Sequence, residues 1–166
     1  MKVLGLAGWS GSGKTTLIVK LIPELVSRGL RVSTIKHAHH AFEVDKPGKD
    51  SYRHREAGAT EVLVSSEHRW ALMHEHRGDE EPVVGDLIRH MTPVDLLLIE
   101  GFKRDTHDKL EIFRRSLAKP LLSTGDASFV AVLTDGAIPE TALPVIDLND
   151  VTAIADFIIT QYRLQH

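Results

Sequence analysis

Short apolar runs alternate with amphipathic stretches along most of this chain. Residues 2–7 form an apolar run that ends at a glycine-rich loop, and residues 14–28 follow with apolar positions at helical spacing before Gly29. Residues 31–36 have the pattern of a second strand. Strand, helix and strand in this order predict a βαβ unit, whose crossover favours parallel strands.

The middle of the chain departs from this alternation. After a polar stretch, Asp50 is placed to cap a short helix over 51–57. Residues 60–66 and 69–76 then predict two antiparallel strands with a tight connection. We therefore expect an inserted hairpin over about 60–75.

The second half returns to strands and helices. A continuous apolar run over 94–101 is typical of a strand that is covered on both faces. The other elements expected here are helices over 82–91 and 150–164 and strands over 109–115, 129–135 and 144–148. Together these patterns predict an α/β fold, a mostly parallel sheet flanked by helices, in a single domain over 1–166.

Composition favours a soluble globular protein. Hydrophobic residues make up 42% of the chain and charged residues 26%, and no apolar run approaches the ~20 residues of a membrane span. The absence of cysteine excludes disulfides, thiolate catalysis and iron–sulfur ligation by this chain. The default expectation is a cytoplasmic protein that does not bind a membrane.

Charge is distributed unevenly. The first sixty residues hold ten of the twenty Lys and Arg but only five of the twenty-three Asp and Glu, although the net charge is -3. The positive half contains the glycine-rich loop, which suits a polyphosphate ligand. A nucleic-acid-binding protein would more often be basic overall, so we expect no nucleic acid partner.

The glycine-rich loop carries the most specific local motif. Residues 8–15, GWSGSGKT, fit the pattern GxxxxGKT between a strand and a helix, where main-chain N–H groups cradle phosphates. Lys14 would bridge the β- and γ-phosphates, and the Thr15 hydroxyl would bind Mg²⁺. The predicted nucleotide-binding residues of this motif are Gly8, Trp9, Ser10, Gly11, Ser12, Gly13, Lys14, Thr15 and Thr16.

A second metal-directed carboxylate is expected at the end of a neighbouring buried strand. Asp95 and Glu100 flank the apolar run, about 16 Å apart along an extended strand. Ligands bind at the carboxyl edge of a parallel sheet, so Glu100 is the candidate and Asp95 is expected to be structural. Glu100 would contact Mg²⁺ through a water or orient the attacking water.

The loop after residues 31–36 opens at the same predicted edge. Asp45 is a further candidate magnesium contact, and Lys46, Lys49 and Arg53 are candidate phosphate contacts. A plain solvated loop explains these residues nearly as well.

Histidines gather in the same loop. His37, His39 and His40 invite a zinc or nickel hypothesis, but their spacing matches no structural zinc pattern. Hydrogen-bonding or partner-facing histidines are favoured instead. In the predicted hairpin, Trp70 and Met73 are interpreted as core or dimer contacts.

A late strand ends with a candidate for base recognition. Guanine offers N1–H and an exocyclic amine, a donor pair that one carboxylate accepts. The NKxD sequence in which GTP-binding proteins usually place this Asp is absent, yet Asp135 ends the strand over 129–135, and a flanking contact would come from Asn149. These residues favour GTP over ATP, although Asp135 also fits a turn.

The chain resembles the MobB family of molybdopterin-guanine dinucleotide biosynthesis adapter proteins. The resemblance runs from residue 3 to about 160 and includes GWSGSGKTTL, IKHAHH, RWALM and DLNDV. Its most specific parts are KPGKDSYRHREAGA and EGFK.

The resemblance implies a P-loop protein that binds GTP and Mg²⁺, forms a homodimer and hydrolyses GTP weakly. Its implied partners are the guanylyltransferase MobA, to which it would supply or position GTP, and molybdopterin or the molybdenum cofactor. By position, Lys14 and Glu100 would serve the phosphates and the metal, residues 45–55 would bind a second anion, and Asp135 would lie where base recognition is expected.

Two other functions fit the same motif. A small-molecule kinase would use Lys103, Arg104, Arg114 or Arg115 as a lid, but no base for the acceptor hydroxyl is evident. A metal-insertion GTPase would use the histidine cluster.

Overall fold

The residues that the computed structural model describes are 1–38, 42–102, 105–137 and 140–165. The backbone divides into two compact units: a larger one, Met1–His37 with Met91–His166, and a smaller one, Ala38–His90. The expected single domain over 1–166 stays a prediction.

A six-stranded sheet is the centre of the larger unit. Its strands are β1 (Lys2–Ala7), β2 (Val32–Lys36), β5 (Leu96–Glu100), β6 (Lys109–Phe113), β7 (Phe129–Thr134) and β8 (Val145–Asp147). They lie in the order β2-β5-β1-β6-β7-β8, and every neighbouring pair is parallel. The predicted α/β fold with a flanked parallel sheet is confirmed, and the carboxyl ends of the strands share one edge.

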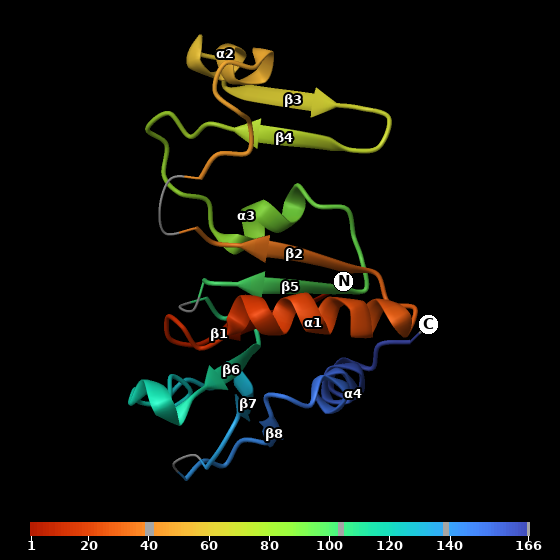
Figure 1. Ribbon diagram of the computed structural model, residues 1–166, viewed down its shortest axis with the longest axis vertical. Helices are drawn as coiled ribbons and strands as arrows, with labels where there is room; N and C mark the ends of the chain where they lie inside the picture. Colours follow the sequence, from red (N-terminus) through yellow and green to blue (C-terminus); the bar gives the residue numbers. More distant parts are fainter. Residues whose placement is uncertain (39–41, 103–104, 138–139, 166) are drawn as a thin grey trace. The chain divides into compact units, whose positions relative to one another are not determined.

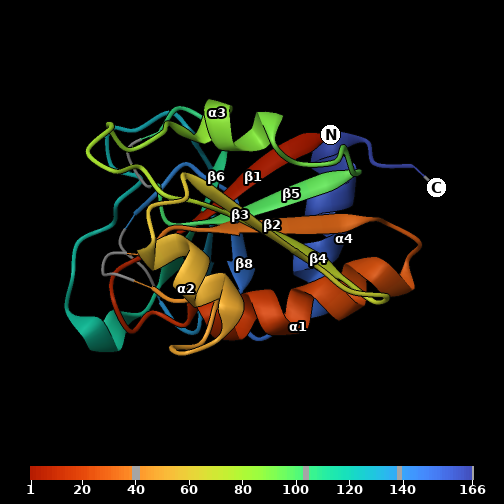
Figure 2. The same cartoon turned by 90° about the horizontal axis from the view of Figure 1, so that it is seen from above.

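Strand order brings residues together that sequence order separates. β5 lies between β1 and β2, so that Glu100 is in register with both Leu6 and Lys36 (Figures 1 and 2). The glycine-rich loop that follows β1 lies at the same end as the arrowheads of β2 and β5, at the left in Figure 1. The residue that ends β5 is therefore positioned beside the loop.

Two helices pack on one face of this sheet. α1 (Lys14–Ser27) and α4 (Val151–Tyr162) share a core with the strands, in which Leu21, Leu25 and Ile158 are fully buried. Each such side chain contributes about 1.5–3 kcal/mol by leaving water. Within the described residues, no helix is both long and apolar enough to cross a membrane.

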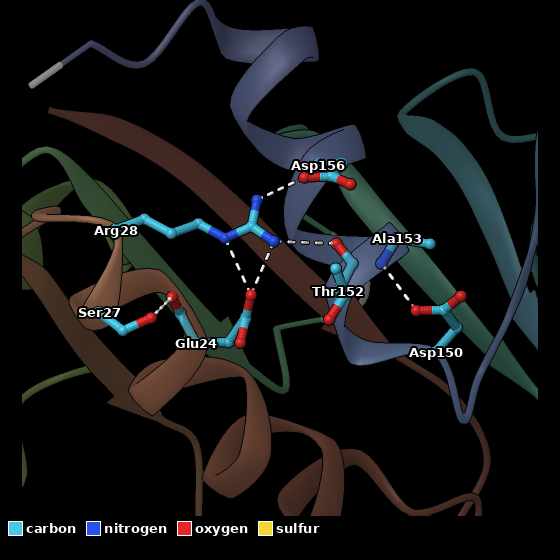
Figure 3. Close-up of polar contacts among 7 residues, drawn as sticks. All are labelled: Glu24, Ser27, Arg28, Asp150, Thr152, Ala153 and Asp156. Atoms are coloured by element: carbon cyan, nitrogen blue, oxygen red, sulfur yellow. Dashed lines mark hydrogen bonds and ion pairs between the residues drawn. The ribbon is translucent and has the colours of Figure 1, made fainter.

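Polar contacts join the two helices at the end of α1. Arg28 donates hydrogen bonds to the Glu24 carboxylate in its own helix and to Asp156 and the Thr152 carbonyl of α4 (Figure 3). Asp150 caps α4 by accepting from the Ala153 N–H at 2.9 Å. The end of α1 that is remote from the loop is thus tied to α4.

β6 is buried on both faces although its sequence alternates apolar and polar residues. Lys109 is 1% exposed and Glu111 is fully buried. Glu111 accepts hydrogen bonds from the Leu122 and Ser123 N–H groups at 2.6 and 2.8 Å. A chain segment that sequence patterns leave unassigned therefore covers the polar face of this strand.

The smaller unit contains the predicted hairpin. Its elements are α2 (Asp50–Glu56), β3 (Glu61–Ser65), β4 (Trp70–His74) and α3 (Val84–Arg89). β3 and β4 pair antiparallel, which confirms the hairpin.

Two details of the predicted helices in this unit are wrong. The first helix begins at Asp50, with Lys49 in the capping position and no side-chain cap, because Asp50 itself adopts the helical conformation. The helix predicted over 82–91 is shorter, since the chain is still extended at Val83 and the helix ends at Arg89.

Candidate functional site

The glycine-rich loop joins β1 to α1 in a conformation that only small residues permit. Gly13 has φ 100°, in the left-handed region, and lies immediately before α1. A Cβ on Gly8 would lie 2.7 Å from the Ile112 carbonyl oxygen. The loop therefore passes close to β6, and the first turn of α1 presents N–H groups that have no acceptor inside the helix.

Lys14 folds back over this loop. Its ammonium donates to the Gly8 carbonyl at 2.9 Å and to the Trp9 carbonyl at 3.2 Å. Ser10 is exposed in the loop, and Thr16 is exposed in the first turn of the helix. The predicted phosphate-binding residues from Gly8 to Thr16 are thus contiguous in space as well as in sequence.

The predicted metal ligands of the larger unit meet directly. Thr15 Oγ1 donates a hydrogen bond of 2.8 Å to Glu100 Oε1. The Glu100 side chain is only 14% exposed, and its other oxygen lies 3.8 Å from Lys36 Nζ. Asp95, by contrast, accepts from the Arg31 main-chain N–H at 2.8 Å and from its guanidinium, and this hydrogen bonding lowers the pKa of Asp95.

The Thr15 and Glu100 oxygens fit magnesium. Mg²⁺ prefers oxygen ligands at about 2.1 Å in an octahedron, which leaves two adjacent ligands about 3.0 Å apart. The 2.8 Å separation of Thr15 Oγ1 and Glu100 Oε1 is close to that value. In the described residues, no group of three or more His, Cys, Asp or Glu side chains is placed to hold a metal ion.

On the other side of the loop, Arg114 and Asp135 follow β6 and β7. Arg114 Nε donates to the Ser12 carbonyl oxygen at 2.8 Å, and Arg114 Nη1 donates to Asp135 Oδ2. Asp135, the predicted base-recognition residue, is thereby connected to the glycine-rich loop. Local sequence indicates Arg114 only as a kinase lid, whereas its place directly after a strand that adjoins β1 is the signal that identifies this contact.

Residues 117–123, which carry no recognisable motif, also contact the loop. Trp9 Nε1 donates to the Pro120 carbonyl oxygen at 2.9 Å, and Lys119 Nζ lies 5.6 Å from the Trp9 ring centre. The hydrogen bonds from Leu122 and Ser123 to Glu111 hold the end of this segment. Trp9 is therefore held against this segment beside the glycine-rich loop, and its predicted nucleotide contact stays a prediction.

The remaining predicted site residues belong to the smaller unit. The Asp45 side chain is 4% exposed and pairs with Arg55 at 3.2 Å. The other three, Lys46, Lys49 and Arg53, are exposed. Arg53 Nη1 lies 4.0 Å from Asp50 Oδ1. The magnesium role of Asp45 and the phosphate roles of the other three stay predictions.

Of the predicted histidine cluster, the structure describes His37 alone. The centre of its ring lies 4.6 Å from the centre of the Phe102 ring. The main-chain N–H of His37 donates to the Glu100 carbonyl oxygen at 2.8 Å. His39 and His40 lie outside the described residues, as do Lys103 and Arg104.

Solved structures with this fold are known. The crystal structure of Bacillus subtilis MobB matches with a TM-score of 0.76 and 24% identity over 97% of this chain and 98% of that one, which shows a common fold. The MobB protein homolog from Bacillus stearothermophilus matches with a TM-score of 0.73 and 25% identity over 99% and 100% of the two chains.

Sequence comparison gives higher identities. The molybdopterin-guanine dinucleotide biosynthesis adapter protein of Escherichia coli (strain K12) is 42% identical over 99% of this chain and 95% of its own. The adapter protein of Haemophilus influenzae is 45% identical over 94% of this chain and 86% of its own. The family model for molybdopterin guanine dinucleotide synthesis protein B matches residues 3–135. The chain therefore belongs to the MobB family.

Proposed function

We propose that this protein is a GTP-binding adapter in molybdopterin guanine dinucleotide biosynthesis. Its family and its curated relatives support the adapter role in that biosynthesis. In the proposal, it supplies or positions Mg²⁺·GTP for the guanylyltransferase MobA, with molybdopterin or the molybdenum cofactor as the second component. The function would be exercised in the cytoplasm.

The arrangement at the carboxyl edge of the sheet carries this proposal. The glycine-rich loop (residues 8–13), called the phosphate loop from here on, lies between the Thr15–Glu100 pair on one side and the Arg114–Asp135 pair on the other. Lys14 and the first turn of α1 would bind the β- and γ-phosphates, and Thr15 with Glu100 would hold Mg²⁺. Asp135 would accept from guanine N1–H and the exocyclic amine.

Slow hydrolysis fits this arrangement. Fast GTP hydrolysis needs a residue that orients water and a cation that neutralises the transition state. Arg114, which contacts the phosphate loop, directs Nε to the Ser12 carbonyl and Nη1 to Asp135. The bound nucleotide would therefore persist long enough to be presented to a partner enzyme.

Calorimetry with GTP and ATP, each with and without Mg²⁺, tests the function. We expect GTP to bind at least 10-fold more tightly than ATP, since one hydrogen bond to a charged group is worth about 1.5–3 kcal/mol. Glu100→Gln should weaken the effect of Mg²⁺ on GTP affinity and leave metal-free binding close to wild type. Equal affinity for the two nucleotides would contradict the proposal.

We further propose that the hairpin forms the homodimer contact. Leu63, Leu72 and Trp70 lie on one face of β3–β4, with Leu63 opposite Leu72 and exposed fractions of 60%, 42% and 63%. Exposed apolar residues that gather on one sheet face are typical of an interaction surface. A second copy of the chain would cover them.

Leu63→Glu should convert the dimer to a monomer, because burying an unpaired carboxylate in an apolar contact is costly. Light scattering after gel filtration measures the mass. Val19→Glu, at a valine that is 64% exposed on α1, is the matched control and should remain dimeric. A wild-type protein that is monomeric at micromolar concentration would refute this proposal.

A further inference from the structure

We infer that Arg114 is a positioning residue for base recognition, which holds the Asp135 carboxylate toward the base and ties it to the phosphate loop. This inference rests on the proposed binding of GTP. It assigns a role in nucleotide specificity to a residue that sequence motifs do not identify.

Strand register explains how the two side chains meet. β6 and β7 are parallel neighbours, and Phe113 at the end of β6 is in register with Thr134 at the end of β7. Arg114 and Asp135 are the next residues, so they leave adjacent strands at the carboxyl edge. Each side chain is 30% exposed, which leaves part of the pair accessible from solvent.

Arg114 also contacts the backbone of the phosphate loop. Its Nε donates to the Ser12 carbonyl oxygen at 2.8 Å, and its Nη2 lies 3.4 Å from the position of a Cβ built on Gly13. The guanidinium therefore lies at contact distance from the loop, and the φ of 100° at Gly13 is what favours glycine there. One planar group thus bonds with the phosphate loop through Nε and with Asp135 through Nη1.

A lysine would not reproduce this bridge. The guanidinium presents its donors in a rigid fork, whereas an ammonium is a point charge on a flexible stem. The Asp135 carboxylate has about four acceptor sites, and Arg114 bonds with Oδ2. Its other acceptor sites suit two donors from one guanine, N1–H and the exocyclic amine, provided that the carboxylate keeps its orientation.

The inference predicts a change in selectivity, which a purely structural contact would not cause. Inosine triphosphate (ITP) keeps N1–H but lacks the exocyclic amine, so the ratio of GTP to ITP affinity reports on the oriented carboxylate. Inorganic tripolyphosphate reports on the phosphate loop alone. If Arg114 only stabilised the loop, its loss would weaken all three ligands by the same factor.

Calorimetry with GTP, ITP and tripolyphosphate should be run on wild type, Arg114→Gln and Arg114→Lys. In wild type we expect GTP to bind roughly 10-fold more tightly than ITP. Both variants should lose most of this preference while tripolyphosphate affinity stays within about twofold. Arg114→Lys keeps the charge and serves as the milder variant if Arg114→Gln does not fold.

Arg115→Gln is the matched control, since this exposed neighbour loses the same charge and should keep the wild-type ratio. A GTP-to-ITP ratio that is unchanged in both Arg114 variants would overturn the inference, as would an equal loss for all three ligands. A wild-type protein that binds ATP as tightly as GTP would instead contradict the proposed function.

Discussion

Replacing Lys14 with methionine should weaken GTP binding by about 30-fold or more. Truncating one partner of a buried, hydrogen-bonded charge pair costs about 2–5 kcal/mol, and methionine keeps most of the apolar stem while removing the ammonium. Lys14 Nζ already lies against the Gly8 and Trp9 carbonyls, so the side chain is held at the loop before any phosphate arrives. Calorimetry with Mg²⁺·GTP measures the change.

The control for this variant lies on the same helix. Lys20 is exposed on α1, and Lys20→Met removes an equal charge outside the phosphate loop. Its GTP affinity should stay within about twofold of wild type. If Lys14→Met kept the GTP affinity of the wild type, the phosphate loop would not be the nucleotide site.

Replacing Asp135 with asparagine should reverse the base preference. Guanine would lose a charged acceptor for two donors, which predicts roughly a 100-fold loss of GTP affinity. Xanthine carries a carbonyl where guanine carries the amine, and the asparagine amide can donate to it. Xanthosine triphosphate should therefore bind the variant more tightly than GTP, as competition calorimetry would show.

Glu140→Gln is the control variant for Asp135→Asn. Glu140 is an exposed carboxylate later in the loop that follows β7, and its replacement removes the same charge. GTP should remain the preferred nucleotide of that variant. If Asp135→Asn weakened both nucleotides equally, Asp135 would act on the stability of the site rather than on the base.

Most of the fold was predictable because the strands and helices carry their own patterns. The buried strand β5 is an unbroken apolar run from Leu96 to Ile99, and the structure places Glu100 beside Thr15 and Asp95 beside Arg31, as expected for opposite ends of one strand. The contact between Thr15 and Glu100 follows from the position of Glu100 at the carboxyl end of β5 together with the phosphate-loop motif.

Contacts between distant segments were not predictable from local patterns. Trp9 and Pro120 are 111 residues apart, and nothing in the sequence near either residue indicates that they meet. The burial of Lys109 and Glu111 in β6 also depends on segments that fold over the strand. Local sequence does not indicate that Arg114 and Asp135 meet, because their adjacency follows only once the order of the strands is known.

The buried Glu111 carboxylate has a consequence for the entropy of ligand binding. Lifting residues 122 and 123 away would remove its two N–H donors and leave a buried polar group without these hydrogen bonds, which costs about 1–3 kcal/mol. The fold itself thus holds the segment beside Trp9 in place, and binding of the proposed nucleotide would require little further ordering of this segment. Because less binding free energy is then lost to ordering the protein, a small number of contacts is enough for a given affinity.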